Sequence, residues 1–141
     1  MEESKNKKSF RVISKNDIDI LIKNTEAKNR SWDRICLHSN SNAKMHSMIM
    51  CMLGNIESGF HLNKNSTDII TYSYLGYPFQ VKIMEEINSG IIEIINIDKL
   101  NPIISIEDST MRCLKNNSSQ TIVYLEQRAG PYIKEEIVWL D

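Results

Sequence analysis

Histidine and tyrosine, two residue types that can perform acid–base chemistry, stand at positions that could build a reactive site. His61 follows a Ser58-Gly59 turn and could serve as a general acid or base, a metal ligand or a hydrogen-bond donor. Its competing role is a structural hydrogen bond near the start of a strand. Tyr72 and Tyr74 are two residues apart and so share one face of a strand, where core packing is the alternative. His61 and Tyr72 are the candidate catalytic residues, and Tyr74 is a candidate ligand contact.

Arg112 and His38 are further candidates for ligand binding. The planar guanidinium fork of Arg112 could hold a phosphate or a carboxylate, although an exposed arginine is the commoner arrangement. His38 could line the same cavity, or it could hold the preceding segment from Arg30 to Arg34 in place. His46 is expected at the surface or at a strand edge.

The cysteines do not indicate a site of their own. Cys36, Cys51 and Cys113 lie within apolar runs and show no C-x-x-C spacing. Cysteine in such runs behaves as a small buried hydrophobe, so we expect neither a disulfide nor a zinc site built from these residues.

Length and charge limit the class of protein. The chain has 141 residues, the usual size of one domain, and a net charge of −1 that favours neither nucleic acid nor an anionic membrane as a partner. No apolar run approaches the ~18 residues of a membrane span, and a cytoplasmic location is expected. The polar run with Lys5, Lys7 and Lys8 predicts a disordered tail over residues 1–10, followed by a single domain over residues 11–141.

The elements that must position these residues are mainly strands. The chain contains 22 isoleucines against four valines, and β-branched side chains suit a pleated sheet. One helix is predicted over residues 15–28, where apolar residues recur at helical spacing. Short runs separated by turns then predict strands, in order, at Met48–Leu53, Ile69–Leu75, Phe79–Met84, Ile91–Ile97, Ile103–Ile106, Met111–Leu114 and Thr121–Gln127. This pattern is typical of an all-β antiparallel sandwich or barrel.

Three stretches in order resemble the WbuC family of cupin-fold proteins, which is associated with surface-polysaccharide biosynthesis. They are Arg30-Ser-Trp-Asp-Arg-Ile-Cys-Leu-His38, Gly54-Asn-Ile-Glu-Ser-Gly-Phe-His-Leu-Asn63 and Leu125-Glu-Gln-Arg-Ala-Gly-Pro-Tyr132, the last followed by Trp139-Leu140. The resemblance covers about residues 30–140. It implies a cupin-type double-stranded β-helix with an N-terminal helix.

The resemblance also implies a degenerate metal site. Metal-binding cupins use an H-x-H pair, a nearby glutamate and a later histidine, and these positions fall on His61, Asn63, about Asp68 and about Arg112. Asn63 and Asp68 could still ligate a hard cation together with His61. An inward guanidinium ~4 Å from a divalent ion would cost about 8 kcal/mol, so no cofactor is expected if Arg112 points inward.

The leading hypothesis is a small-molecule-binding cupin of WbuC type in surface-polysaccharide (including lipopolysaccharide) or sugar metabolism, without a catalytic transition metal. Its expected ligand is anionic, such as a nucleotide sugar or sugar phosphate, held by His38, Asn63, Asp68, Tyr74 and Arg112. Gly59-Phe-His-Leu-Asn-Lys64 faintly resembles the sugar ketoisomerases, so the alternative is a metal-free nucleotide-sugar isomerase or epimerase with His61 as base. A third hypothesis is an inactive cupin that serves as an interaction subunit. Whether the protein is an enzyme stays open, and a homodimer is expected.

Overall fold

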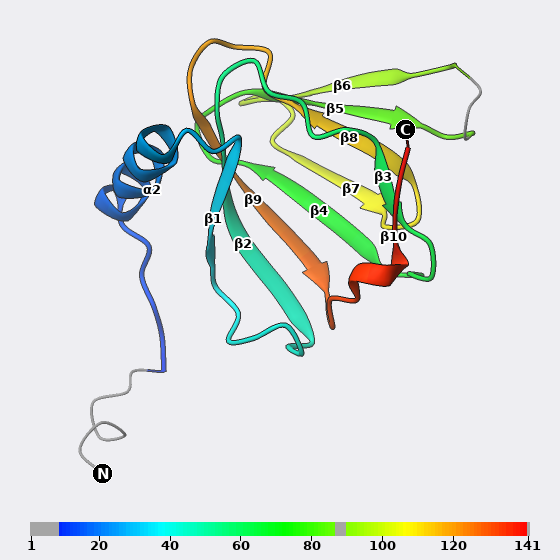
Figure 1. Ribbon diagram of the computed structural model, residues 1–141, viewed down its shortest axis with the longest axis horizontal. Helices are drawn as coiled ribbons and strands as arrows, with labels where there is room; N and C mark the ends of the chain where they lie inside the picture. Colours follow the sequence, from blue (N-terminus) through cyan, green and yellow to red (C-terminus); the bar gives the residue numbers. More distant parts are fainter. Residues whose placement is uncertain (1–8, 87–89, 141) are drawn as a thin grey trace.

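The computed structural model describes residues 9–86 and 90–140. The tail predicted over residues 1–10 lies almost entirely outside the described residues, as does most of the predicted turn at Asn88-Ser89-Gly90. Within the described ranges, one α-helix precedes two five-stranded antiparallel sheets that face each other (Figure 1). The predicted all-β sandwich with an N-terminal helix is confirmed.

Helix α2 (Lys15–Lys28) begins and ends at local signals in the sequence. Ser14 is the N-cap, and its hydroxyl accepts from the Asp17 backbone N–H while the Asp17 carboxylate accepts from the Ser14 N–H. Asn29 ends the helix in the left-handed region, at φ 51°. No helix in the described ranges is long and apolar enough to cross a membrane.

The two sheets are built from segments far apart in the sequence. Sheet A has the strand order β1 (Trp32–Cys36), β2 (Met45–Met52), β9 (Ile122–Ala129), β4 (Ile69–Tyr74) and β7 (Ile103–Glu107). Sheet B has the order β10 (Ile137–Trp139), β3 (His61–Asn63), β8 (Met111–Lys115), β5 (Phe79–Met84) and β6 (Glu93–Ile97). A short 3₁₀ turn (Lys134–Glu136) leads into β10.

Every predicted strand is present, but three strands were not predicted. Strands β1, β3 and β10 have only three to five residues, and β1 and β3 lack a run of β-branched side chains. They form because longer strands offer them an edge: β1 pairs along its whole length with β2, and β10 pairs with β3. Non-local pairing of this kind leaves little signal in the short segment itself.

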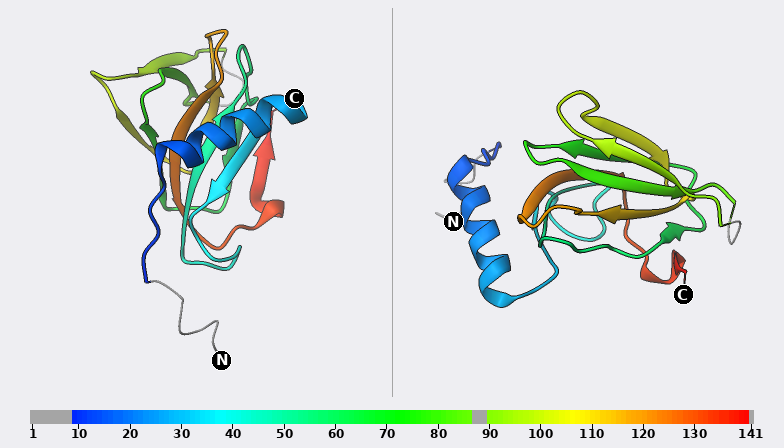
Figure 2. Two further views of the ribbon diagram at one scale, coloured as in Figure 1. Left: turned by 90° about the vertical axis from the view of Figure 1, so that its left-hand side faces the viewer. Right: turned by 90° about the horizontal axis from the view of Figure 1, so that it is seen from above.

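Helix α2 covers part of the outer face of sheet A. Leu21 of α2 packs against Ile49 and Cys51 of β2 and Val123 of β9, on the outer face of the sheet. Figure 2 shows the helix lying across this side of the molecule. The helix therefore stabilises the two strands whose opposite faces point between the sheets.

The space between the sheets is divided into an apolar core and a polar end. Buried side chains of both sheets form the core, including Tyr72, Val81, Leu114 and Tyr124. Residues two apart on β9 share its inward face, so after Tyr124 this face continues with Glu126 and then Arg128. The change from apolar to charged residues along one strand marks where the core ends and a cavity begins.

Candidate functional site

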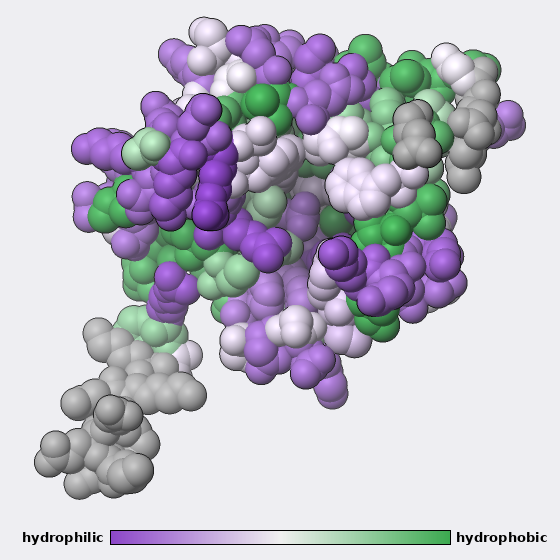
Figure 3. All heavy atoms as spheres, viewed as in Figure 1, coloured by the Kyte–Doolittle hydropathy of each residue, from purple (hydrophilic) through white to green (hydrophobic). Residues whose placement is uncertain are grey.

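A cavity has two lobes: both sheets line the aromatic lobe, whereas strands of sheet A and adjacent loop residues line the polar lobe. The polar lobe has a volume of about 350 Å³, and the aromatic lobe about 270 Å³. Four residues line both lobes, and we call this set the junction: Arg34, Glu126, Arg128 and Tyr132. On the face shown in Figure 3, the surface is hollowed between the two sheets. The shared lining makes the two lobes adjoining parts of one site.

Strand alternation explains how the lobes are lined. On β1, Trp32 faces the aromatic lobe, Arg34 the junction and Cys36 the polar lobe, in steps of two residues or about 7 Å. On the neighbouring β2, Met50 lines the aromatic lobe, whereas Met48 lines the polar lobe. Each of these strands therefore contributes to both lobes.

A buried ion cluster forms one wall beside the cavity. Asp108, between β7 and β8, accepts from Arg112 at 2.8 Å through Oδ1 and from Arg128 at 2.8 Å through Oδ2. Arg112 also donates from Nε to the Tyr72 hydroxyl at 3.2 Å and to the backbone carbonyls of Asp108 and Thr110. One carboxylate therefore pairs with two guanidinium groups, all of them at least nine-tenths buried.

Arg112 and Arg128 differ in how well the chain satisfies them. The described residues provide Arg112 with four hydrogen bonds, from Nε and both terminal nitrogens. Arg128 is 8% exposed, and its Nε has no hydrogen-bond partner in the described part of the chain. Asn63 donates to Asp108, but its Oδ1 is likewise without a partner among these residues. Buried polar atoms seldom lack a hydrogen-bond partner, so Nε of Arg128 and Oδ1 of Asn63 are available to a ligand or to water.

His61 is held as an uncharged imidazole. Its Nδ1 lies 3.1 Å from the Gly59 carbonyl oxygen and must donate to it, so Nε2 carries a lone pair. The ring packs on Trp139, with centroids 4.6 Å apart. Burial, followed by the positive charge of Arg112, lowers the pKa of His61 to about 4. In the aromatic lobe His61 is therefore a hydrogen-bond acceptor.

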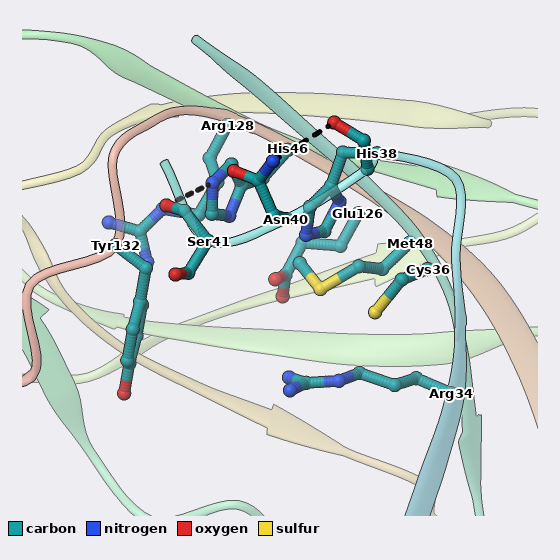
Figure 4. Close-up of a pocket in the computed structure, with 11 residues that line it drawn as sticks. Arg34, Cys36, His38, Asn40, Ser41, His46, Met48, Glu126, Arg128 and Tyr132 are labelled. Carbon is teal, nitrogen blue, oxygen red and sulfur yellow. Dashed lines mark hydrogen bonds between the residues drawn. The ribbon is translucent and has the colours of Figure 1, made fainter. Parts of the chain in front are cut away.

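Glu126 is the second acid–base group of the cavity. It lines both lobes, and its carboxyl group forms no hydrogen bond or ion pair with the described residues. Burial raises its pKa, and the nearby Arg112 and Arg128 only partly oppose this effect. Figure 4 shows the Glu126 carboxyl inside the polar lobe, with Arg34 reaching toward the same space from β1.

The structure brings together some of the sequence candidates. His61, Asn63 and Arg112 are neighbours across β3 and β8, where His61 pairs with Arg112. His38 lines the polar lobe, with its ring stacked on His46 at 4.1 Å. The prediction that His46 lies at the surface is wrong: it is 4% exposed, because the loop carrying Ser41 covers it and accepts from Nε2.

Other candidates lie outside the lobes. Asp68 is exposed and lines neither lobe, because it precedes β4 at the rim of the sheet. The partner of Arg112 is Asp108. Tyr72 is fully buried with its hydroxyl bonded to Arg112, and Tyr74 packs against the core, so neither lines a lobe.

Sequence reasoning missed several residues of the site, including Arg34, Glu126, Arg128 and Trp139. All four stand in the stretches that carry the family resemblance. The two-residue spacing of Tyr124, Glu126 and Arg128 could have placed them on one face. Cys36 was expected to be buried, but it is exposed because it continues the cavity-facing side of β1.

The residues do not fit the divalent cation of metal-binding cupins. No group of three or more histidine, cysteine, aspartate or glutamate side chains is placed to hold a metal in residues 9–86 and 90–140. Arg112 points inward and lies beside His61 and Asn63, which is the arrangement that disfavours a cation there.

Comparisons with known proteins identify the fold and no family. No protein-family model matches the chain, and no curated protein matches its sequence. Its structure is similar to that of the capsular polysaccharide assembling protein CapF from Staphylococcus aureus, with a TM-score of 0.60 and 8% identity over 77% of this chain and 34% of CapF. The chain has the cupin fold.

Two further solved structures support the same conclusion. Oxalate decarboxylase from Lactobacillus farciminis matches with a TM-score of 0.60 and 10% identity, over 79% of this chain and 32% of the enzyme. The cupin domain of Cnp3 from Schizosaccharomyces pombe matches with a TM-score of 0.54 and 11% identity, over 71% of this chain and 65% of that domain. The chain spans only about a third of CapF and of the decarboxylase. Membership of the WbuC family stays a prediction.

Proposed function

We propose that this protein is a small-molecule-binding cupin of WbuC type that binds a sugar-type ligand in surface-polysaccharide or sugar metabolism, without a catalytic transition metal. The observation that carries the proposal is the two-lobed cavity, whose aromatic lobe is lined by both sheets. Its walls combine flat apolar groups with a few hydrogen-bonding groups, as ligand sites do. A cavity filled by side chains would instead have favoured a purely structural subunit, and this cavity is open.

The aromatic lobe suits a ring-shaped ligand. Trp32 and Trp139 both line it, together with Tyr124, and His61 offers an acceptor nitrogen beside them. A ligand with one apolar face and several hydroxyl groups could pack on the aromatic rings and donate to His61. The likeness in fold to CapF, a capsular polysaccharide assembling protein, is consistent with a role near polysaccharide synthesis.

Calorimetric titration tests the proposal directly. Wild-type protein is titrated with UDP-glucose, glucose 1-phosphate and glucose, and one-to-one binding of at least one of them is expected. Trp139→Leu should weaken that binding at least fivefold, because Trp139 lines the lobe. Val138→Ala is the matched control, since Val138 is adjacent on β10 and lines neither lobe. Absence of binding by the wild type, or equal losses in both variants, would contradict the proposal.

A metal-free isomerase or epimerase is the second candidate function. His61 and Glu126 line the same lobe, and their environments shift their pKa values in opposite directions, down for His61 and up for Glu126. Such a pair could accept a proton from the carbon next to a carbonyl and donate one to the carbonyl oxygen. We would follow exchange of that carbon-bound proton in D₂O by NMR, using a nucleotide-linked keto sugar. Exchange lost in both His61→Gln and Glu126→Gln would support the enzyme, whereas no exchange with wild type would exclude this substrate class.

A further inference from the structure

The charges at the junction do not balance. Asp108 supplies one negative charge to two buried guanidinium groups, those of Arg112 and Arg128. Arg34 adds a third cation, whose side chain has no hydrogen-bond or ion-pair partner in the described part of the chain. Among the described residues the carboxyl group that lines the lobes is that of Glu126, and even when it is ionised three guanidinium groups face two carboxylates. A cavity wall with surplus positive charge attracts an anion.

The unsatisfied donor points to where the anion would lie. Arg112 makes four hydrogen bonds within the chain, so it gains little from an outside partner. Arg128 differs: it is 8% exposed, it lines both lobes, and its Nε has no partner among the described residues. Arg34 approaches the same space from β1, on the opposite side of β2 from Arg128 on β9.

We propose that Arg34 and Arg128 together bind an anionic group of the ligand, a phosphate or a carboxylate, at the junction between the two lobes. The rest of the ligand then extends into one lobe or both. This inference rests on the proposed function, because it places one part of the ligand whose sugar part the aromatic lobe receives.

Arg34 is the residue to change. It is exposed at the cavity and holds no other side chain, so Arg34→Gln should fold, whereas Arg128 is tied to the ion cluster. Arg30→Gln is the matched control, because Arg30 is exposed, lines neither lobe and loses the same charge. Arg34→Lys keeps the positive charge but removes the planar guanidinium group that can donate two parallel hydrogen bonds.

Inorganic phosphate is the first probe, since it tests the anion subsite without a sugar. Titration at low ionic strength can be followed by tryptophan fluorescence, because both tryptophans of the chain line the aromatic lobe. We expect wild type and Arg30→Gln to bind phosphate alike, Arg34→Gln to bind at least tenfold more weakly, and Arg34→Lys to lie between them. Absence of phosphate binding by the wild type, or equal weakening in Arg30→Gln and Arg34→Gln, would overturn the subsite.

Sugar ligands separate this inference from the proposed function. Glucose 1-phosphate and glucuronate should each bind to the wild type more tightly than glucose, and this difference in affinity should vanish in Arg34→Gln. The relative affinities of glucose 1-phosphate and glucuronate show whether the subsite prefers phosphate or carboxylate. Glucose bound equally by wild type and Arg34→Gln, with no gain from the phosphate, would refute the subsite and leave the sugar site standing. Phosphate binding that depends on Arg34, with no sugar bound, would uphold the subsite and refute the sugar ligand.

Discussion

Replacing Asp108 by asparagine should strongly destabilise the protein. Asp108 is 2% exposed, and each of its carboxylate oxygens accepts from a different buried arginine at 2.8 Å. Asparagine keeps the shape but offers one acceptor oxygen and an NH₂ donor that faces a guanidinium. One arginine would then lose its partner, and the cluster would lose its only negative charge.

The expected size of the effect follows from the burial of all three groups. Breaking a buried ion pair by removing one partner costs about 3–5 kcal/mol. That is a large part of the roughly 5–15 kcal/mol by which small domains are stable. Because Asp108 serves two arginines, we expect Asp108→Asn to lower the free energy of unfolding by at least 3 kcal/mol.

Urea unfolding followed by tryptophan fluorescence measures this loss. The midpoint should fall while the slope stays near that of the wild type, which would mark a change in stability alone. Glu107→Gln is the control: Glu107 is the preceding residue and is exposed, so its loss should stay within about 0.5 kcal/mol. A loss below about 1 kcal/mol in Asp108→Asn would show that the buried ion cluster contributes little to the stability of the fold.

Three further outcomes are expected. The pKa of His61 is about 4 in the folded protein against 6.5 for the free side chain, so the stability that neutral His61 contributes is complete above pH 6.5 and is lost as pH falls toward 4. The loss is at most about 3 kcal/mol. Urea midpoints across this pH range should therefore fall less in His61→Gln than in wild type, and parallel curves would contradict this. Gly130→Ala should lower the free energy of unfolding by about 2 kcal/mol or more, because a Cβ at this position would clash with the Ala43 carbonyl and come within 2.7 Å of the His46 ring. A thermal midpoint equal to that of the wild type would refute this prediction. Elemental analysis of protein purified without added metal should find well under one equivalent of transition metal, and stoichiometric metal lost in His61→Ala would show that expectation to be wrong.

Most of the fold could be predicted because its signals are local. The helix is fixed by the Ser14–Asp17 capping box and by Asn29, all within two turns of its ends. The longer strands coincide with short apolar runs bounded by turns. Strands β1, β3 and β10 carry no comparable signal, because partners elsewhere in the chain make them strands.

The site was predicted less well because its residues come together only in three dimensions. The backbone N–H of Asp108 donates to the Asp68 carbonyl at 2.9 Å, so the two aspartates are neighbours. Their side chains nevertheless differ: that of Asp108 is buried and that of Asp68 is exposed. The sequence alone does not indicate which of the two carboxylates points into the protein. The spacing of Asp108 and Arg112, four residues apart across a turn, was the available clue.

The place of β9 in sheet A has a consequence for how the chain folds as it is synthesised. Strand β9 lies between β2 and β4, yet it follows every other strand of its sheet in the sequence. Until β9 emerges, β2 and β4 expose unpaired edges, and Glu126 and Arg128 are missing from the cavity. Joining the sheet then requires closure of loops as long as that between Met45 and Ala129, which slows folding. A ribosome-bound chain that ends before Ile122 should therefore be aggregation-prone and depend on chaperones.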